Sequence, residues 1–156
     1  MELEKAIRAD LNSAMLAKKE LEVSVLRQIL ATAQNKEKEK KFKSNGGEVH
    51  LTEEELLEVV LLEAKKRRES IELFTQGNRP ALADKEKAEL AILEKYMPEQ
   101  MNQEDVKKLA AEIITKTGAK EIKDMGQVMA ELSPKIKGRV DGSLAGKIVK
   151  ELLLGK

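Results

Sequence analysis

Apolar residues recur at three- and four-residue spacing along almost the whole chain, and two-residue alternation is nearly absent. This spacing gathers apolar side chains on one face of an α-helix. The pattern therefore predicts an all-α protein in which each helix buries one face. The clearest early faces consist of Leu3, Ile7, Leu11, Ala14 and Met15 in a first helix, and of Leu26, Ile29, Leu30 and Ala33 in a second.

Start and stop signals divide the N-terminal part of the chain into four helices. The second helix should end in the Ser, Asn and Gly run at residues 44–47, because Gly and Asn accept the backbone angles of a helix stop. Thr52 and Glu55 form a capping box that begins the third helix. That helix should stop at Gly77, and Pro80 suits the first turn of the fourth. We predict an N-terminal helical bundle.

The segment around Pro98 is the predicted domain boundary. Pro98 breaks the helical period, and Asn102 offers a new N-cap. Three shorter apolar faces follow it. We therefore expect an N-terminal helical domain over residues 1–97 and a small three-helix C-terminal tail domain over residues 98–156.

Glycine, aspartate and proline predict how the C-terminal helices begin and end. Gly118 should end the first of them, and Asp124 should cap the second. Gly126 is expected to allow close packing between helices. Pro134 predicts that the second helix ends near Leu132, which would leave an exposed basic turn before the last helix.

Composition excludes several classes of site. The chain has no cysteine, which removes disulfides, thiolate metal sites and cysteine nucleophiles. Its single histidine, His50, lies in a predicted loop without a Ser or Cys partner nearby, so we expect it to be solvated rather than catalytic. The glycines match neither nucleotide-binding spacing. We therefore expect no catalytic residue, no metal site and no cofactor.

The N-terminal residues MELEKAIRADL mix acids and bases without a long apolar core, so we expect no secretory signal. The longest apolar run, residues 59–62, is far shorter than the roughly 20 residues that span a bilayer. These features predict a soluble, cytoplasmic protein with no membrane partner.

Charge placement is more informative than the net charge of +1. Residues 102–156 hold 11 Lys and Arg side chains against eight Asp and Glu, and Asp141 is the only acid within residues 133–150. Two interpretations stay open: an ordinary solvated surface, or a patch that contacts phosphate groups. The candidate nucleic-acid-binding residues are Lys135, Lys137, Gly138, Arg139, Lys147 and Lys150.

Two other basic runs have less specific patterns. Residues 36–43 lie at an expected fraying helix end, which favours solvation over binding. Residues 65–68 lie inside a long helix, where some stems should cover apolar surface. Either run could extend a nucleic-acid footprint. The three aromatic residues, Phe42, Phe74 and Tyr96, are all expected to be structural.

Several short motifs occur in an order that resembles a known family. In the C-terminal part they are Met125–Met129, Lys137–Gly142 and a closing helix through Ile148–Leu152; upstream they are Leu26-Arg27 with Ile29-Leu30, Lys66–Ser70 with Phe74, Gly77–Arg79 and Tyr96–Gln100. The C-terminal motifs resemble the tail domain of the B subunit of tRNA-dependent amidotransferases. The whole chain resembles the stand-alone YqeY-like family, which carries the same tail.

This resemblance implies an N-terminal helical bundle joined to a small helical tail. In the amidotransferase the tail helps to hold tRNA, while ATP-dependent activation and glutamine hydrolysis belong to other domains and subunits. The resemblance therefore implies tRNA as a partner. It also marks Lys137 and Arg139 as the best phosphate contacts, beside Gly138 in a turn where a Cβ atom would be unwelcome.

The predicted function is that of a tRNA-binding or tRNA-metabolism accessory protein without a catalytic site of its own. The scarcity of aromatic residues favours recognition of RNA backbone and shape over base stacking. One alternative is a carbon–nitrogen ligase activity with glutamine as amide donor, exerted together with a partner subunit. Another is a helical module that binds a protein partner.

Overall fold

The computed structural model describes residues 2–155, which form seven α-helices and one short 3-10 helix and contain no β-strand. The prediction of an all-α fold is confirmed. Contacts between residues divide the chain into two compact units, Met1–Met97 and Pro98–Lys156. Each unit has its own apolar core.

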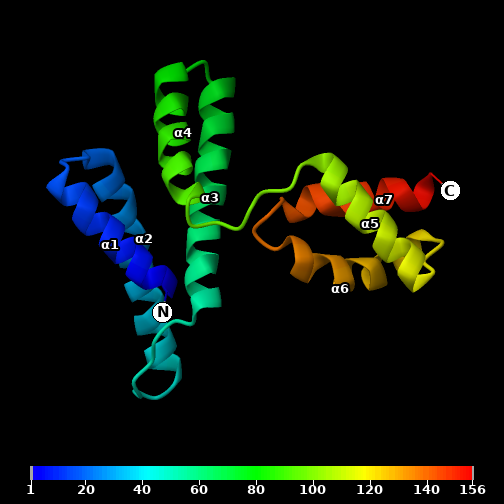
Figure 1. Ribbon diagram of the computed structural model, residues 1–156, viewed down its shortest axis with the longest axis horizontal. Coiled ribbons are helices and arrows are strands. Elements are labelled where there is room, and N and C mark those ends of the chain that lie inside the picture. The colour runs from blue at the N-terminus through cyan, green and yellow to red at the C-terminus, as the bar shows by residue number, and fades with distance from the viewer. Residues whose placement is uncertain (1, 156) are drawn as a thin grey trace. The chain divides into compact units, whose positions relative to one another are not determined.

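The N-terminal unit contains four helices: α1 (Glu2–Leu16), α2 (Glu20–Lys43), α3 (Glu53–Gln76) and α4 (Pro80–Glu94). Figure 1 shows α3 and α4 side by side as a hairpin, with α1 lying along α2. The capping box at the start of α3 is confirmed, because the Thr52 hydroxyl accepts a hydrogen bond from the Glu55 amide at 3.1 Å while the Glu55 carboxylate accepts one from the Thr52 amide at 2.7 Å.

The core of the N-terminal unit forms where α1, α2 and the first half of α3 meet. From α4 it receives Leu93, near the end of that helix, and the partly buried Leu90 and Ile92 pack against it. The second half of α3 extends beyond this core and packs along α4. The buried members are Ile7, Val25, Leu26, Ile29, Leu30, Ala33, Leu51, Leu56, Val59, Val60, Ala64 and Leu93. One long face of α2 is consequently left to solvent.

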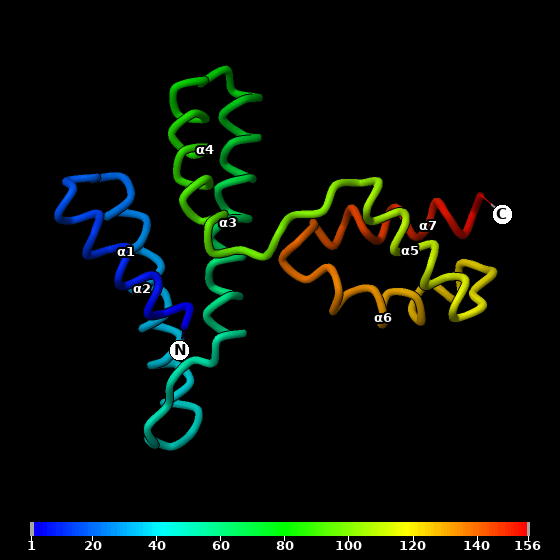
Figure 2. The backbone as a smooth tube through the Cα atoms, in the orientation of Figure 1, coloured from blue at the N-terminus to red at the C-terminus, as the bar shows by residue number. Residues whose placement is uncertain are grey.

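The C-terminal unit contains three α-helices and a 3-10 helix: α5 (Gln103–Thr117), η1 (Ile122–Asp124), α6 (Met125–Ile136) and α7 (Gly142–Leu154). The backbone trace in Figure 2 shows these three α-helices joined by short connections. Asn102 caps α5 through a capping box with Asp105, and Gly118 ends it with a left-handed φ of 73°. The core consists of Val106, Ala110, Ile113, Ile114, Ala119, Val128, Leu132, Ile136, Ala145, Ile148, Val149 and Leu153.

Helix α6 does not end near Leu132, as Pro134 had suggested, but continues to Ile136 with the proline inside its last turn. Val128, Leu132 and Ile136 are four residues apart and all buried, so they share one face of the helix. Burial of Ile136 outweighs the single backbone hydrogen bond that a proline so close to the helix end removes. Lys135 is therefore helical, and the exposed turn begins only after Ile136.

Two further expectations about the start of α6 are wrong. The Asp124 side chain does not cap α6; its carboxylate accepts hydrogen bonds from the Lys120 and Glu121 amides at 3.0 and 3.1 Å and so caps η1. These bonds lower the pKa of Asp124. Gly126 does not allow close packing, because a Cβ atom built on it would meet nothing within 4 Å.

Phe42 is also not structural. Helix α2 continues to Lys43, past the end of the core, and 87% of the Phe42 surface is exposed. Tyr96, in contrast, is partly buried, and its hydroxyl donates a hydrogen bond to the Asp10 carboxylate at 2.5 Å. Met15, expected on the apolar face of α1, is half exposed.

Candidate nucleic-acid interface

A type II β-turn joins α6 to the segment that enters α7. The Arg139 amide donates to the Ile136 carbonyl at 2.8 Å, Lys137 has φ −54° and ψ 119°, and Gly138 has φ 75°. The third position of this turn requires a positive φ, which glycine adopts without a steric penalty. The expectation that a Cβ atom would be unwelcome at Gly138 is confirmed, and the turn leaves the Lys137 side chain exposed.

This turn is fastened to the first residues of the C-terminal unit. The Gln100 side-chain amide donates to the Gly138 carbonyl at 2.7 Å. The Arg139 Nε atom donates to the Glu99 carbonyl at 2.9 Å, and the Met101 amide donates to the Arg139 carbonyl at 2.8 Å. Part of the Arg139 guanidinium is thus committed to holding backbone, which its sequence context did not indicate.

The remaining candidate lysines are all exposed. Lys135, in the last turn of α6, lies beside Lys137 and Arg139 at the α6–α7 connection. Lys147 and Lys150 are three residues apart and share a face of α7, roughly 8 and 12 Å along the helix from Gly142. The first three cations therefore lie within five residues of the α6–α7 connection, and the last two lie along the helix that follows it.

The single acid of this stretch has another role. Asp141 is the N-cap of α7, and its carboxylate accepts a hydrogen bond from the Ser143 amide at 2.9 Å. Within residues 2–155, Lys135, Lys147 and Lys150 form no ion pair at all. Their ammonium groups are consequently available to an external anion.

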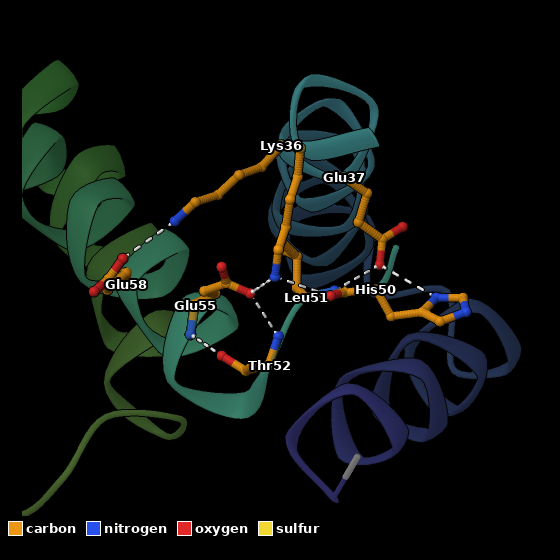
Figure 3. Close-up of polar contacts among 8 residues, drawn as sticks. Lys36, Glu37, His50, Leu51, Thr52, Glu55 and Glu58 are labelled. Atoms are coloured by element: carbon orange, nitrogen blue, oxygen red, sulfur yellow. Dashed lines mark hydrogen bonds and ion pairs between the residues drawn. The ribbon is translucent and has the colours of Figure 1, made fainter. Parts of the chain in front are cut away.

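Two lysines of the basic run at residues 36–43 form ion pairs with α3. The run is helical to Lys43 rather than frayed. Lys36 lies 3.2 Å from the Glu58 carboxylate and Lys40 lies 2.7 Å from that of Glu55, so both lysines tie α2 to α3 (Figure 3). Solvation alone therefore does not describe this run. We call these two ion pairs the α2–α3 latch.

Glu55 is the centre of the latch. Its carboxylate accepts a hydrogen bond from Lys40 and another from the Thr52 amide, and these bonds lower its pKa. The same carboxylate therefore caps α3 and holds α2.

His50 lies in the loop beside the latch, as Figure 3 shows. Its Nδ1 atom is 3.8 Å from the Glu37 carboxylate, which also accepts a hydrogen bond from the Leu51 amide at 3.2 Å. The imidazole is mostly exposed. These contacts fasten the loop that precedes α3.

The basic block at residues 65–68 contains a buried cation that sequence reasoning missed. Arg67 is 6% exposed and Glu63 is 1% exposed, and the two side chains are hydrogen-bonded. Arg67 also donates to the Gln28 side chain at 2.9 Å and lies 3.6 Å from the Glu89 carboxylate. The only signal in the sequence was the four-residue spacing of Glu63 and Arg67.

No helix within residues 2–155 is long and apolar enough to cross a membrane. Over the same range, no three His, Asp or Glu side chains are grouped so that they could hold a metal ion.

Curated relatives carry the name "Altered inheritance of mitochondria protein 41, mitochondrial". The chain is 31% identical to the Saccharomyces cerevisiae protein over 132 residues, which cover 81% of this chain and 68% of the relative. It is 37% identical to the Kluyveromyces lactis protein over 91 residues, which cover 58% of this chain and 46% of that one. These names assign the relatives to mitochondria, while the cytoplasmic location of this chain stays a prediction.

The sequence also matches the pattern of the family described as "Yqey-like protein" over residues 4–153, nearly the whole of both structural units. The helices, the turn at Gly138 and the cations around it all fall within this match. The chain therefore belongs to the YqeY-like protein family.

Proposed function

We propose that this protein binds tRNA through the C-terminal unit and serves as an accessory protein in tRNA metabolism. The observation that carries the proposal is the set of exposed lysines around the α6–α7 connection, within residues 133–150, where the only acid, Asp141, is used as a helix cap. The resemblance of this unit to the amidotransferase tail supports tRNA as the nucleic acid.

The expected mode of binding is electrostatic. Lysine ammonium groups meet phosphate oxygens as point charges and carry no sequence information. Folded RNA is read largely by its shape and its backbone. Binding should therefore be salt-dependent, with a slope that grows with the number of phosphates neutralised.

The test is binding of the purified protein to total cellular tRNA at two salt concentrations, together with a variant in which the exposed lysines of the patch are replaced. The variant carries Lys135→Ala, Lys137→Ala, Lys147→Ala and Lys150→Ala. Arg139 is left intact, because its loss would also release the backbone at Glu99. We expect the variant to bind at least tenfold more weakly and with a shallower salt dependence.

The matched control replaces cations elsewhere in the same unit. Lys107 and Lys108 lie exposed on α5, outside the α6–α7 connection. Replacing both with alanine, and comparing with the pair Lys135→Ala and Lys137→Ala, separates a specific patch from a general effect of charge. Equal losses from the two pairs, or no binding by the unaltered protein, would contradict the proposal.

A further inference from the structure

The solvent face of α2 carries cations, amides and an aromatic ring in one row. From Ser24 to Lys41 its members follow one another at alternating spacings of three and four residues, and Phe42 lies four residues after Lys38, so they share one side of the helix. We call this row the α2 stripe; it consists of Ser24, Arg27, Ala31, Gln34, Lys38, Lys41 and Phe42, all exposed. It runs for about 27 Å along the helix.

The α2 stripe contains no acid. Residues 23–36 include no Asp or Glu, although the chain has 28 of them in 156 residues. The nearest acids are Glu20, one turn before Ser24, Glu37, one turn before Lys41, and Glu39 beside Lys38. The Glu37 carboxylate accepts a hydrogen bond from the Leu51 amide and lies 3.8 Å from His50 Nδ1. Within the described chain, residues 2–155, neither Lys38 nor Lys41 takes part in an ion pair. Exposed cations that no carboxylate pairs suit an anionic partner.

The α2–α3 latch holds the stripe in place. Lys36 and Lys40 face α3, on the side of α2 opposite Phe42, since successive residues turn by about 100° around a helix. Figure 3 shows Lys36 reaching Glu58 on α3, and Lys40 pairs with Glu55 on the same helix. The latch thus orders the last turns of α2 where the apolar core has ended. Phe42 and Lys38 are presented from a held helix rather than from a loose end.

The other end of the stripe borders a hollow. This open cavity of about 590 Å³ is lined by Met15, Lys18, Glu20, Val23, Ser24 and Arg27. Among residues 2–155 the Arg27 guanidinium donates a hydrogen bond only to the Met15 sulfur, at 3.9 Å, and that atom is a weak acceptor. Arg27 can therefore donate to a phosphate or a base edge at this position.

We infer that the α2 stripe binds unpaired nucleotides of RNA, with the ring of Phe42 stacked on a base and with Arg27, Lys38 and Lys41 on phosphates. An aromatic ring flanked by cations is the arrangement that holds single-stranded nucleic acid. The inference rests on the RNA-binding function proposed above and adds a second contact, within the N-terminal unit. It also adds base stacking to the recognition of RNA backbone and shape that the scarcity of aromatic residues favours.

Two other partners fit the stripe less well. A helix that lies in a membrane surface buries a broad apolar face, whereas the stripe offers only Phe42 and Ala31. The centre of a protein–protein interface is likewise built from several apolar and aromatic side chains. One ring among cations and amides matches a chain of bases and phosphates better than either.

Tryptophan fluorescence gives a direct test, because the chain contains no tryptophan. Phe42→Trp places a single reporter on the stripe. Leu73→Trp places a matched reporter on α3, where Leu73 is also well exposed. We expect an unstructured 12-nucleotide RNA and tRNA to quench the first variant and not the second. A blue shift with phosphatidylserine vesicles, without quenching by RNA, would overturn the inference in favour of a membrane.

Affinity measurements provide an independent readout. Phe42→Ala should weaken binding of the same 12-nucleotide RNA by about 5- to 100-fold, while Phe42→Tyr should preserve it. Lys38→Ala with Lys41→Ala should reduce the salt slope by about 0.7 for each lysine. The control pair Lys85→Ala and Lys87→Ala, on α4, should leave the slope unchanged.

The outcomes separate this inference from the proposed function. If the four-lysine variant of the C-terminal unit loses tRNA while Phe42→Ala binds normally and Phe42→Trp is not quenched, the function stands and the stripe inference fails. If the RNA oligomer quenches Phe42→Trp while the four-lysine variant binds tRNA as well as the unaltered protein does, the stripe inference stands and the proposed C-terminal interface fails. No binding of either RNA rejects both.

Discussion

Arg67 is the most enclosed cation of the N-terminal unit, and its guanidinium faces oxygen atoms from α2, α3 and α4. Removing one partner from a buried ion pair leaves the other charge uncompensated, which costs about 3–5 kcal/mol. We predict that Arg67→Met lowers the free energy of unfolding of this unit by about 3–5 kcal/mol, measured by urea titration followed by circular dichroism.

The neighbouring Arg68 is exposed and serves as the control. Arg68→Met should change the free energy of unfolding by less than about 0.5 kcal/mol. Adding Glu63→Leu to Arg67→Met should restore part of the stability, because neither member of the buried pair then remains charged. Equal stability of the two single variants would contradict a buried ionic role for Arg67.

Tyr96 connects the end of the N-terminal unit to α1. Its hydroxyl donates to Asp10, and burial, followed by this hydrogen bond, raises its pKa above the ordinary value of 10.0. We predict that Tyr96→Phe lowers the free energy of unfolding by about 1.5 kcal/mol near pH 8, because the hydrogen bond to a carboxylate is lost.

Tyr96 should also make the stability depend on alkaline pH. A raised pKa in the folded state gives a contribution that is complete below the unfolded value and declines as the pH rises above it. The stability difference between the unaltered protein and Tyr96→Phe should therefore shrink between pH 9 and pH 11. A constant difference across this range would show that the phenol ionises equally in both states.

Alanine substitutions at two glycines, one in α6 and one in the turn that follows it, should change the stability of the C-terminal unit in opposite directions. Gly138 has φ 75°, so Gly138→Ala should destabilise the C-terminal unit by about 1–2 kcal/mol. Gly126 is helical with open space around it, so Gly126→Ala should stabilise the unit by up to about 1 kcal/mol. Thermal unfolding of both variants checks the signs, and a neutral or stabilising effect of Gly138→Ala would refute the type II turn.

The helices could be predicted because their signals are local. The capping box at Thr52, the N-cap at Asn102 and the helix end at Gly118 depend on residues within one turn of each other, and all three were predicted. The end of α6 was not, because it is decided by burial of Ile136 against other helices. A local breaker such as Pro134 predicts a helix end only when packing does not oppose it.

The candidate site was predictable in its residue types and not in their roles. The acid-poor stretch around Lys137 is visible in the sequence, but the bond from Arg139 to Glu99 joins residues 40 positions apart. Arg67 looked like one of four equivalent cations because only the packing of three helices distinguishes it. Phe42 looked structural because aromatic residues usually are buried, and the sequence does not show where a core ends.

The division of the molecule into two units predicts that a core mutation in one unit destabilises that unit and not the other. We predicted a domain boundary after residue 97. That the two domains fold separately stays a prediction. Leu132 is fully buried in the C-terminal core, so Leu132→Ala should destabilise that unit by about 2–5 kcal/mol. Amide hydrogen exchange of the full chain should then accelerate in α5–α7 while α2 and α3 keep their protection. Acceleration in both units would indicate a single cooperative fold.

The buried group around Arg67 has a consequence for how this family can change over time. Arg67 is enclosed by Glu63, Gln28 and Glu89. A substitution of Arg67 by a neutral residue, with no other change, would leave the carboxylates uncompensated. Related chains that have lost the arginine should also have lost the acid at position 63, often with a new residue at position 28 or 89. These four positions should therefore covary, while their exposed neighbours Lys65 and Arg68 vary freely.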